Sequence, residues 1–123
     1  MGKRVLVVDD EHDIANLEKV ILTGAGFDVE IAHSGQEALD MVAASAPDVM
    51  VLDVMMPGMD GWEVAGRLKA DPGTKQVPIL MLTAQGLGEE SVPTFSHINE
   101  YYTKPFEPGR LVKLVKRLAG EKR

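Results

Sequence analysis

The chain has 123 residues, of which 45% are hydrophobic and 26% charged, with a formal net charge of −6 and no cysteine. This length suits one domain, predicted to span residues 1–123, and the absence of cysteine excludes disulfides and thiolate metal sites, which fits the cytoplasm. The acidic balance disfavours direct nucleic-acid binding, and neither a membrane span nor a signal peptide is expected from the sequence.

Strand-like apolar runs alternate with segments of helical period along the chain. The predicted elements, in chain order, are a strand over 4–8, a helix over 13–23, a strand over 28–32, a helix over 34–45, a strand over 48–53, a helix over 61–70, a strand over 78–83, a short strand over 100–103 and a helix over 108–118. The strand over 28–32 alternates and is expected to be less central than the others.

Several residues define where the predicted helices begin and which face they bury. Ser34 and Glu37 form a capping box, and Asp60 is placed to cap the helix that follows it. The expected buried residues of the first and last helices are Ile14, Leu17, Ile21 and Leu22, and Leu111, Leu114, Val115 and Leu118.

The segment 85–93 resists this pattern, because it contains Gly86, Gly88 and Pro93 where a helix is due. A short or irregular fourth helix is therefore expected. The alternation otherwise predicts a doubly wound α/β sandwich with a parallel sheet, whose ligands bind beyond the carboxyl ends of the strands.

Acidic residues end two of the most apolar strands. Asp9 and Asp10 follow the first strand and Asp53 closes the third, so their carboxylates are expected to form one pocket at the same edge of the sheet. Close carboxylates stay ionised only beside a cation, and ligands that are all oxygen favour Mg²⁺ before Mn²⁺ or Ca²⁺. Thr83 and Lys104 also follow strands and supply a hydroxyl and a positive charge suited to a transferred phosphoryl group.

Four short motifs occur in order along nearly the whole chain. They are Val7-Val8-Asp9-Asp10-Glu11, Leu52-Asp53-Val54-Met55-Met56-Pro57-Gly58-Met59-Asp60-Gly61, Leu82-Thr83-Ala84 and Tyr101-Tyr102-Thr103-Lys104-Pro105-Phe106. Together they resemble the CheY-like receiver domain of two-component response regulators. The resemblance implies a flavodoxin-like (βα)5 three-layer sandwich with the strand order 2-1-3-4-5.

The resemblance also implies a role for each motif residue. Asp53 would accept a phosphoryl group from a histidine kinase or a phosphotransfer protein. Asp10, Asp53 and the backbone carbonyl of Met55 would hold Mg²⁺, while Asp9 would bind a water of the metal. Thr83 and Lys104 would hold the phosphoryl oxygens.

A switch is implied by the same resemblance. The Thr83 hydroxyl would move toward the phosphate and the Tyr101 ring would turn inward, with Tyr102 as the alternative ring. The peptide bond between Lys104 and Pro105 resembles a family position that is cis. The segment 95–100 departs from the usual family pattern, which puts the output surface in doubt.

The partners implied are a kinase and a downstream output protein or fused output domain, with the chain a monomer or a phosphorylation-dependent dimer. Residues 107–123 carry a net charge of +4, which fits either a contact with an acidic partner or nucleic acid, or a solvated helix face. Residues 119–123 are expected to form a tail or linker stub. His12, His33 and His97 are interpreted as surface residues.

Three other functions compete with a phosphoacceptor switch, which is not a metabolic enzyme and catalyses only its own phosphorylation and dephosphorylation. An aspartate-nucleophile phosphatase would need an Asp-x-Asp-x-Thr motif, where this chain reads Asp9-Asp10-Glu11-His12-Asp13. A flavodoxin-like cofactor carrier would need a neutral phosphate loop in place of these acids. A degenerate receiver would lack part of the acidic and phosphoryl-binding set that is complete here.

Overall fold

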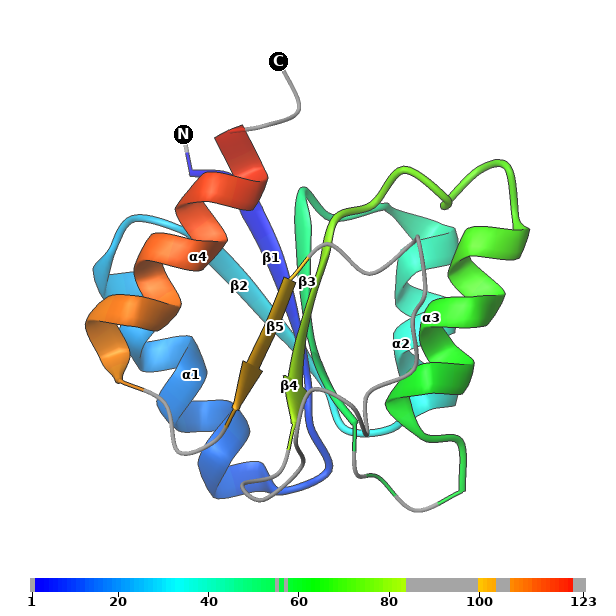
Figure 1. The fold of residues 1–123 in the computed structure, drawn as a ribbon, viewed down its shortest axis with the longest axis horizontal. Coiled ribbons are helices and arrows are strands. Elements are labelled where there is room, and N and C mark those ends of the chain that lie inside the picture. Colours follow the sequence, from blue (N-terminus) through cyan, green and yellow to red (C-terminus); the bar gives the residue numbers. More distant parts are fainter. Residues whose placement is uncertain (1, 55, 57, 84–99, 104–106, 121–123) are drawn as a thin grey trace.

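The computed structural model describes residues 2–54, 56, 58–83, 100–103 and 107–120, with only the backbone at 83 and 100–103 (Figure 1). The elements are β1 (Arg4–Val8), α1 (His12–Gly24), β2 (Asp28–Ala32), α2 (Gly35–Ala44), β3 (Val49–Asp53), α3 (Gly61–Ala70), β4 (Ile79–Thr83), β5 (Glu100–Thr103) and α4 (Pro108–Gly120). No helix in these ranges is long and apolar enough to cross a membrane.

All five strands form one parallel sheet in the order β2-β1-β3-β4-β5. Helices α1 and α4 cover one face of the sheet and α2 and α3 cover the other (Figure 1). This confirms the predicted doubly wound sandwich and its strand order. The predicted fourth helix falls within residues 84–99, which lie outside the described residues.

Side-chain alternation along the central strands builds a separate hydrophobic core on each face of the sheet. In β1, Val5 and Val7 belong to the cluster beneath α1 and α4, whereas Leu6 and Val8 belong to the cluster beneath α2 and α3. All five residues of β3 are buried, while β2 lies at the edge and buries fully only Ala32. The prediction that this strand is less central is confirmed.

Two predicted helix caps are present. The Ser34 side chain accepts a hydrogen bond from the N–H of Glu37 at 3.1 Å, and Asp60 accepts one from the N–H of Glu63 at 2.9 Å. The return bond of the capping box differs from the expectation, because Glu37 Oε1 accepts from the N–H of His33, one residue before the cap. The glutamate thereby ties the end of β2 to the start of α2.

Two details of the helix predictions were wrong. Leu17 was expected on the buried face of α1 but leaves 49% of its surface exposed. Ala15 and Glu18 occupy the buried positions on either side of it. The last helix also continues beyond Leu118, and Ala119 is buried at 3% exposure, so this residue belongs to the helix rather than to a tail.

Hydrogen bonds join neighbouring elements at the amino edge of the sheet. The Arg4 guanidinium donates to Glu30 and to the Ser45 hydroxyl, and the Arg4 N–H donates to Asp48. On the other side, Lys69 at the end of α3 donates to the carbonyls of Lys75 and Val77. These contacts fix the loops opposite the acidic residues.

Candidate functional site

Strand register brings the predicted acids together. Val8 pairs with Leu52 across β1 and β3, so the next residues, Asp9 and Asp53, stand level at the carboxyl edge of the sheet. Their side chains fall on the same face because the alternation of both strands is in phase. Asp10 lies two residues beyond Val8, the last paired residue of β1.

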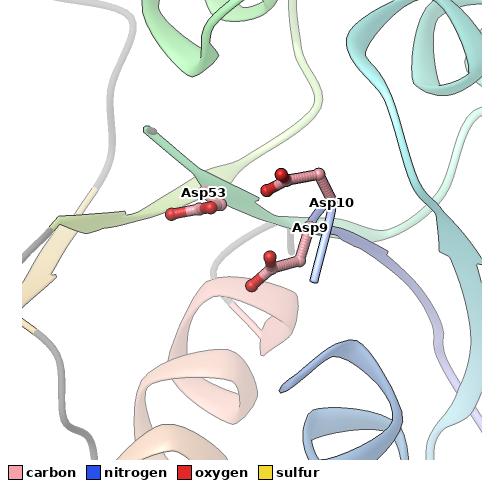
Figure 2. Close-up of side chains that lie close together, drawn as sticks. All are labelled: Asp9, Asp10 and Asp53. Carbon is pink, nitrogen blue, oxygen red and sulfur yellow. The ribbon is translucent and has the colours of Figure 1, made fainter. Parts of the chain in front are cut away.

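The three carboxylates gather beyond the ends of β1 and β3 (Figure 2). One oxygen from each of Asp9, Asp10 and Asp53 lies within 4.8 Å of the other two. Asp9 is 0% exposed and Asp53 is 4% exposed, while Asp10 is partly exposed. The arrangement is therefore a cluster of two buried carboxylates and a third that is partly exposed.

Backbone contacts hold the two deep acids in place. The Asp9 N–H donates to the carbonyl of Ala32 at 3.1 Å, and Asp9 Oδ1 accepts from the N–H of Glu11 at 3.0 Å. Asp53 ends a strand that pairs with β1 on one side and β4 on the other. The two carboxylates thus project from a backbone that is fixed by its neighbours.

Gly61 passes unusually close to the backbone of Asp53. A Cβ atom at residue 61 would lie 2.4 Å from the Asp53 carbonyl oxygen, and the Gly61 N–H donates to the carbonyl of Val54 at 3.0 Å. Only glycine allows this approach. The first turn of α3 therefore packs directly against the end of β3.

The acid cluster is electrostatically unfavourable without a counterion. Two unit charges of one sign about 4 Å apart repel by about 4 kcal/mol at an effective dielectric constant of about 20. A cation within the cluster turns this repulsion into attraction. The donor set consists of oxygen atoms alone, which fits Mg²⁺ better than softer metal ions.

For the other predicted site residues, the structure describes either the backbone alone or nothing. Thr83 ends β4 and pairs with Thr103, so its backbone lies at the same edge of the sheet as the acids. Tyr101 lies in β5 opposite Met81. Met55, Lys104 and Pro105 lie outside the described residues, so the metal-ligand, phosphoryl and cis-peptide predictions for them stay predictions.

A pair of histidines near the acids was missed by sequence reasoning. The rings of His12 and His33 stack with a centroid separation of 3.9 Å and an interplanar angle of 12°. These residues are far apart in the sequence, and the pairing of Val8 with Ala32 brings their two turns together. The pairing of β1 with β2 indicates that the turns after these strands lie together, but it does not indicate that the two rings touch.

Sequence comparison places the chain among response regulators. Residues 5–116 match the family model for the response regulator receiver domain. The chain is 40% identical over 119 residues to response regulator PleD of Caulobacter vibrioides, a match that covers 96% of this chain and 26% of PleD. It is 41% identical over 122 residues to the DNA-binding response regulator MtrA of Mycolicibacterium smegmatis, covering 94% of this chain and 50% of MtrA.

Solved structures of response regulators have the same fold as this chain. A putative response regulator from Chloroflexus aurantiacus superimposes with a TM-score of 0.91 at 40% identity, covering 98% of this chain and 99% of that one. A CheY-like receiver domain protein from Methanospirillum hungatei gives a TM-score of 0.85 at 33% identity, covering 96% and 94%.

Receiver domains are signalling domains rather than classical enzymes. They bind Mg²⁺ through a cluster of aspartates, and they interact with histidine kinases and output domains. The acid cluster, the strand order and the family match agree, and the chain belongs to the response regulator receiver domain family of two-component signal transduction.

Proposed function

We propose that Asp53 is the phosphoacceptor of this receiver domain. The observation that carries the proposal is the position of Asp53, which is 4% exposed yet has an oxygen within 4.8 Å of oxygens of Asp9 and Asp10. A carboxylate at the end of a central buried strand is held rigidly at the sheet edge where ligands of doubly wound folds bind. Such a group is suited to nucleophilic attack on a phosphorus atom.

Asp10, Asp53 and the backbone carbonyl of Met55 are the proposed ligands of Mg²⁺, with Mn²⁺ as a substitute. Asp9, the most deeply buried of the three acids, acts through a water of the metal. The grouping of the three carboxylates supports a shared cation site, because Mg²⁺ binds oxygen ligands and usually keeps several waters. When bound, the ion screens the negative charge of an incoming phosphoryl group.

The reaction is a transfer to the protein itself. A carboxylate oxygen of Asp53 attacks the phosphorus of a phosphohistidine on a kinase or phosphotransfer protein. The bond between phosphorus and the imidazole nitrogen breaks, and the released imidazole keeps the electron pair. Water later hydrolyses the resulting acyl phosphate, which resets the domain.

Thr83 and Lys104 complete the proposed site. The Thr83 hydroxyl and the Lys104 ammonium hold the phosphoryl oxygens, and the Tyr101 ring moves with Thr83 to report the phosphorylated state. The backbone positions of Thr83 and Tyr101 on adjacent strands support this coupling. The cis peptide bond between Lys104 and Pro105 remains part of the proposal.

The chain spans about a quarter of PleD and about half of MtrA. We therefore propose an output domain or a separate output protein as the downstream partner, and residues 1–123 as one receiver domain. The proposed oligomeric state is a monomer or a phosphorylation-dependent dimer. The cytoplasmic location stays a prediction.

The test is phosphorylation by acetyl phosphate with Mg²⁺, followed by intact-protein mass spectrometry. Wild type and the control Asp40→Asn, an exposed aspartate on α2, should each gain one phosphoryl group. Asp53→Asn should gain none, and chelation of the metal should stop the reaction in every variant. A phosphoryl group on Asp53→Asn would refute the assignment.

A further inference from the structure

The stacked histidines join two turns at the carboxyl edge of the sheet. His12 is the first residue of α1 and lies two residues beyond Asp10, whereas His33 directly follows β2. The N–H of His33 donates to Glu37 Oε1 at 2.8 Å, which anchors that turn to α2. The stack therefore connects the turn that carries two of the acids to a turn that is itself fixed.

The three acids differ in how the described residues hold them. Asp9 is held by its own N–H on Ala32 and by the N–H of Glu11 on its carboxylate. Across the described residues, the Asp10 carboxylate makes no hydrogen bond or ion pair. Its position thus depends on the backbone between Asp9 and His12.

We propose that the His12–His33 stack is a positioning element for Asp10 and sets the affinity of the acid cluster for its divalent cation. The inference rests on the proposed metal site. With Asp9 fixed on one side and His12 fixed on the other, the link that carries Asp10 has few free dihedrals. A ligand that is already in place loses less entropy when the ion binds.

The effect of the stack is local rather than global. His12 is exposed and His33 is partly exposed, so the pair buries little surface and adds little to the stability of the fold. Loss of the stack should lower the melting temperature by only a few degrees, while Mg²⁺ binding weakens. This pattern separates positioning from a simple structural contribution.

The test measures Mg²⁺ affinity by NMR titration of the amide signals of the full chain at a single fixed pH. His12→Ala and His33→Ala should each raise the dissociation constant about two- to tenfold, the range expected for an aromatic pair. The double variant should be no worse than either single variant, because both remove the same contact. His12→Phe and His33→Phe retain a flat ring and should therefore bind Mg²⁺ with an affinity close to that of wild type.

Val20→Ala is the matched control, because Val20 lies on the same helix and is 69% exposed. Alanine variants that bind Mg²⁺ as wild type does, additive single effects, or phenylalanine variants that fail to restore affinity would each overturn the positioning role while leaving the acceptor assignment intact. A wild-type chain that binds no Mg²⁺ would overturn both proposals.

Discussion

The two edges of the sheet are built on opposite principles. At the carboxyl edge, three carboxylates of like charge lie within 4.8 Å of one another. At the amino edge, Arg4 and Lys69 donate hydrogen bonds that join separate elements, and the buried Thr74 hydroxyl donates to the carbonyl of Leu68 at 2.6 Å. One edge concentrates charge that needs a ligand, while the other uses polar groups to close loops.

The difference between the two edges indicates that the carboxyl edge serves binding, whereas the amino edge serves stability. Like charges held close together destabilise the fold, and such groups persist where a ligand relieves them. Satisfied hydrogen bonds at the other edge offset that cost without taking part in binding. Substitutions at the carboxyl edge should therefore change phosphorylation and metal binding, whereas substitutions at the amino edge should change stability alone.

The largest expected effect follows substitution of Asp53. Asp53→Asn should reduce phosphorylation to background and, without metal, raise the free energy of unfolding by roughly 0.5–2 kcal/mol, because one of three like charges is removed. Chemical denaturation in the presence of a chelator measures the second effect. With Mg²⁺ the difference should shrink, since the ion stabilises the wild type more. If Asp53→Asn were less stable than wild type without metal, the clustered charges at the carboxyl edge would not be destabilising.

Gly61→Ala should lower both the stability of the fold and the rate of phosphorylation. The added methyl group would lie 2.4 Å from the Asp53 carbonyl oxygen, so the start of α3 or the end of β3 must shift. Overpacking of this kind costs about 1–3 kcal/mol, and the displaced acceptor should be phosphorylated more slowly. Denaturation and the rate of phosphorylation by acetyl phosphate measure these effects.

Gly66→Ala is the control for this substitution. A Cβ atom at Gly66, in the same helix, meets no atom within 4 Å, so this change should be neutral or stabilising. Equal phosphorylation rates for Gly61→Ala and wild type would show that the close approach does not position the acceptor.

Thr74→Val should change stability alone. The substitution keeps the shape of the side chain and removes its hydrogen bond to Leu68, which also accepts from the N–H of Asp71. A loss of about 1 kcal/mol is expected, with Mg²⁺ affinity and phosphorylation unchanged. Weaker Mg²⁺ binding in this variant would contradict the separation of the two edges.

The smallest effect concerns Lys69. Partial burial lowers the pKa of this side chain from its usual 10.5, so the folded state binds fewer protons than the unfolded state just below that pH. Stability should therefore rise slightly as the pH increases through the lowered pKa toward 10.5, because the unfolded state binds more protons over that range. Denaturation across this range should show the slope for wild type and not for Lys69→Met, and the variant should be less stable throughout because it loses both hydrogen bonds.

Much of the fold could be predicted because the apolar pattern follows secondary structure closely. Acids follow β1 and close β3, and parallel pairing must bring those strand ends to one edge, so the cluster could be predicted from the order of residues. Leu17 misled the prediction because it is apolar and lies at helical spacing from Ile14 and Ile21, whereas the buried face of α1 is formed by Ala15, Glu18 and Leu22.

The histidine stack could not be predicted from spacing. His12 and His33 belong to different turns, and their contact depends on the register of β1 against β2 and on the turn geometry set by Glu37. A glutamate bound to the residue before the helix cap is a tertiary detail that the capping-box pattern leaves open. Sequence patterns specify which groups share an edge, and the three-dimensional structure decides which of them touch.

The complete burial of β3 limits how this domain can evolve. Each residue of that strand packs in a core or pairs with a neighbour, so Asp53, the proposed acceptor, tolerates little change around it. Exposed positions such as Leu17 and Val20 on α1 carry no such constraint. Duplicated copies of such a domain can therefore diverge in the partners they recognise while inheriting the same phosphorylation chemistry unaltered.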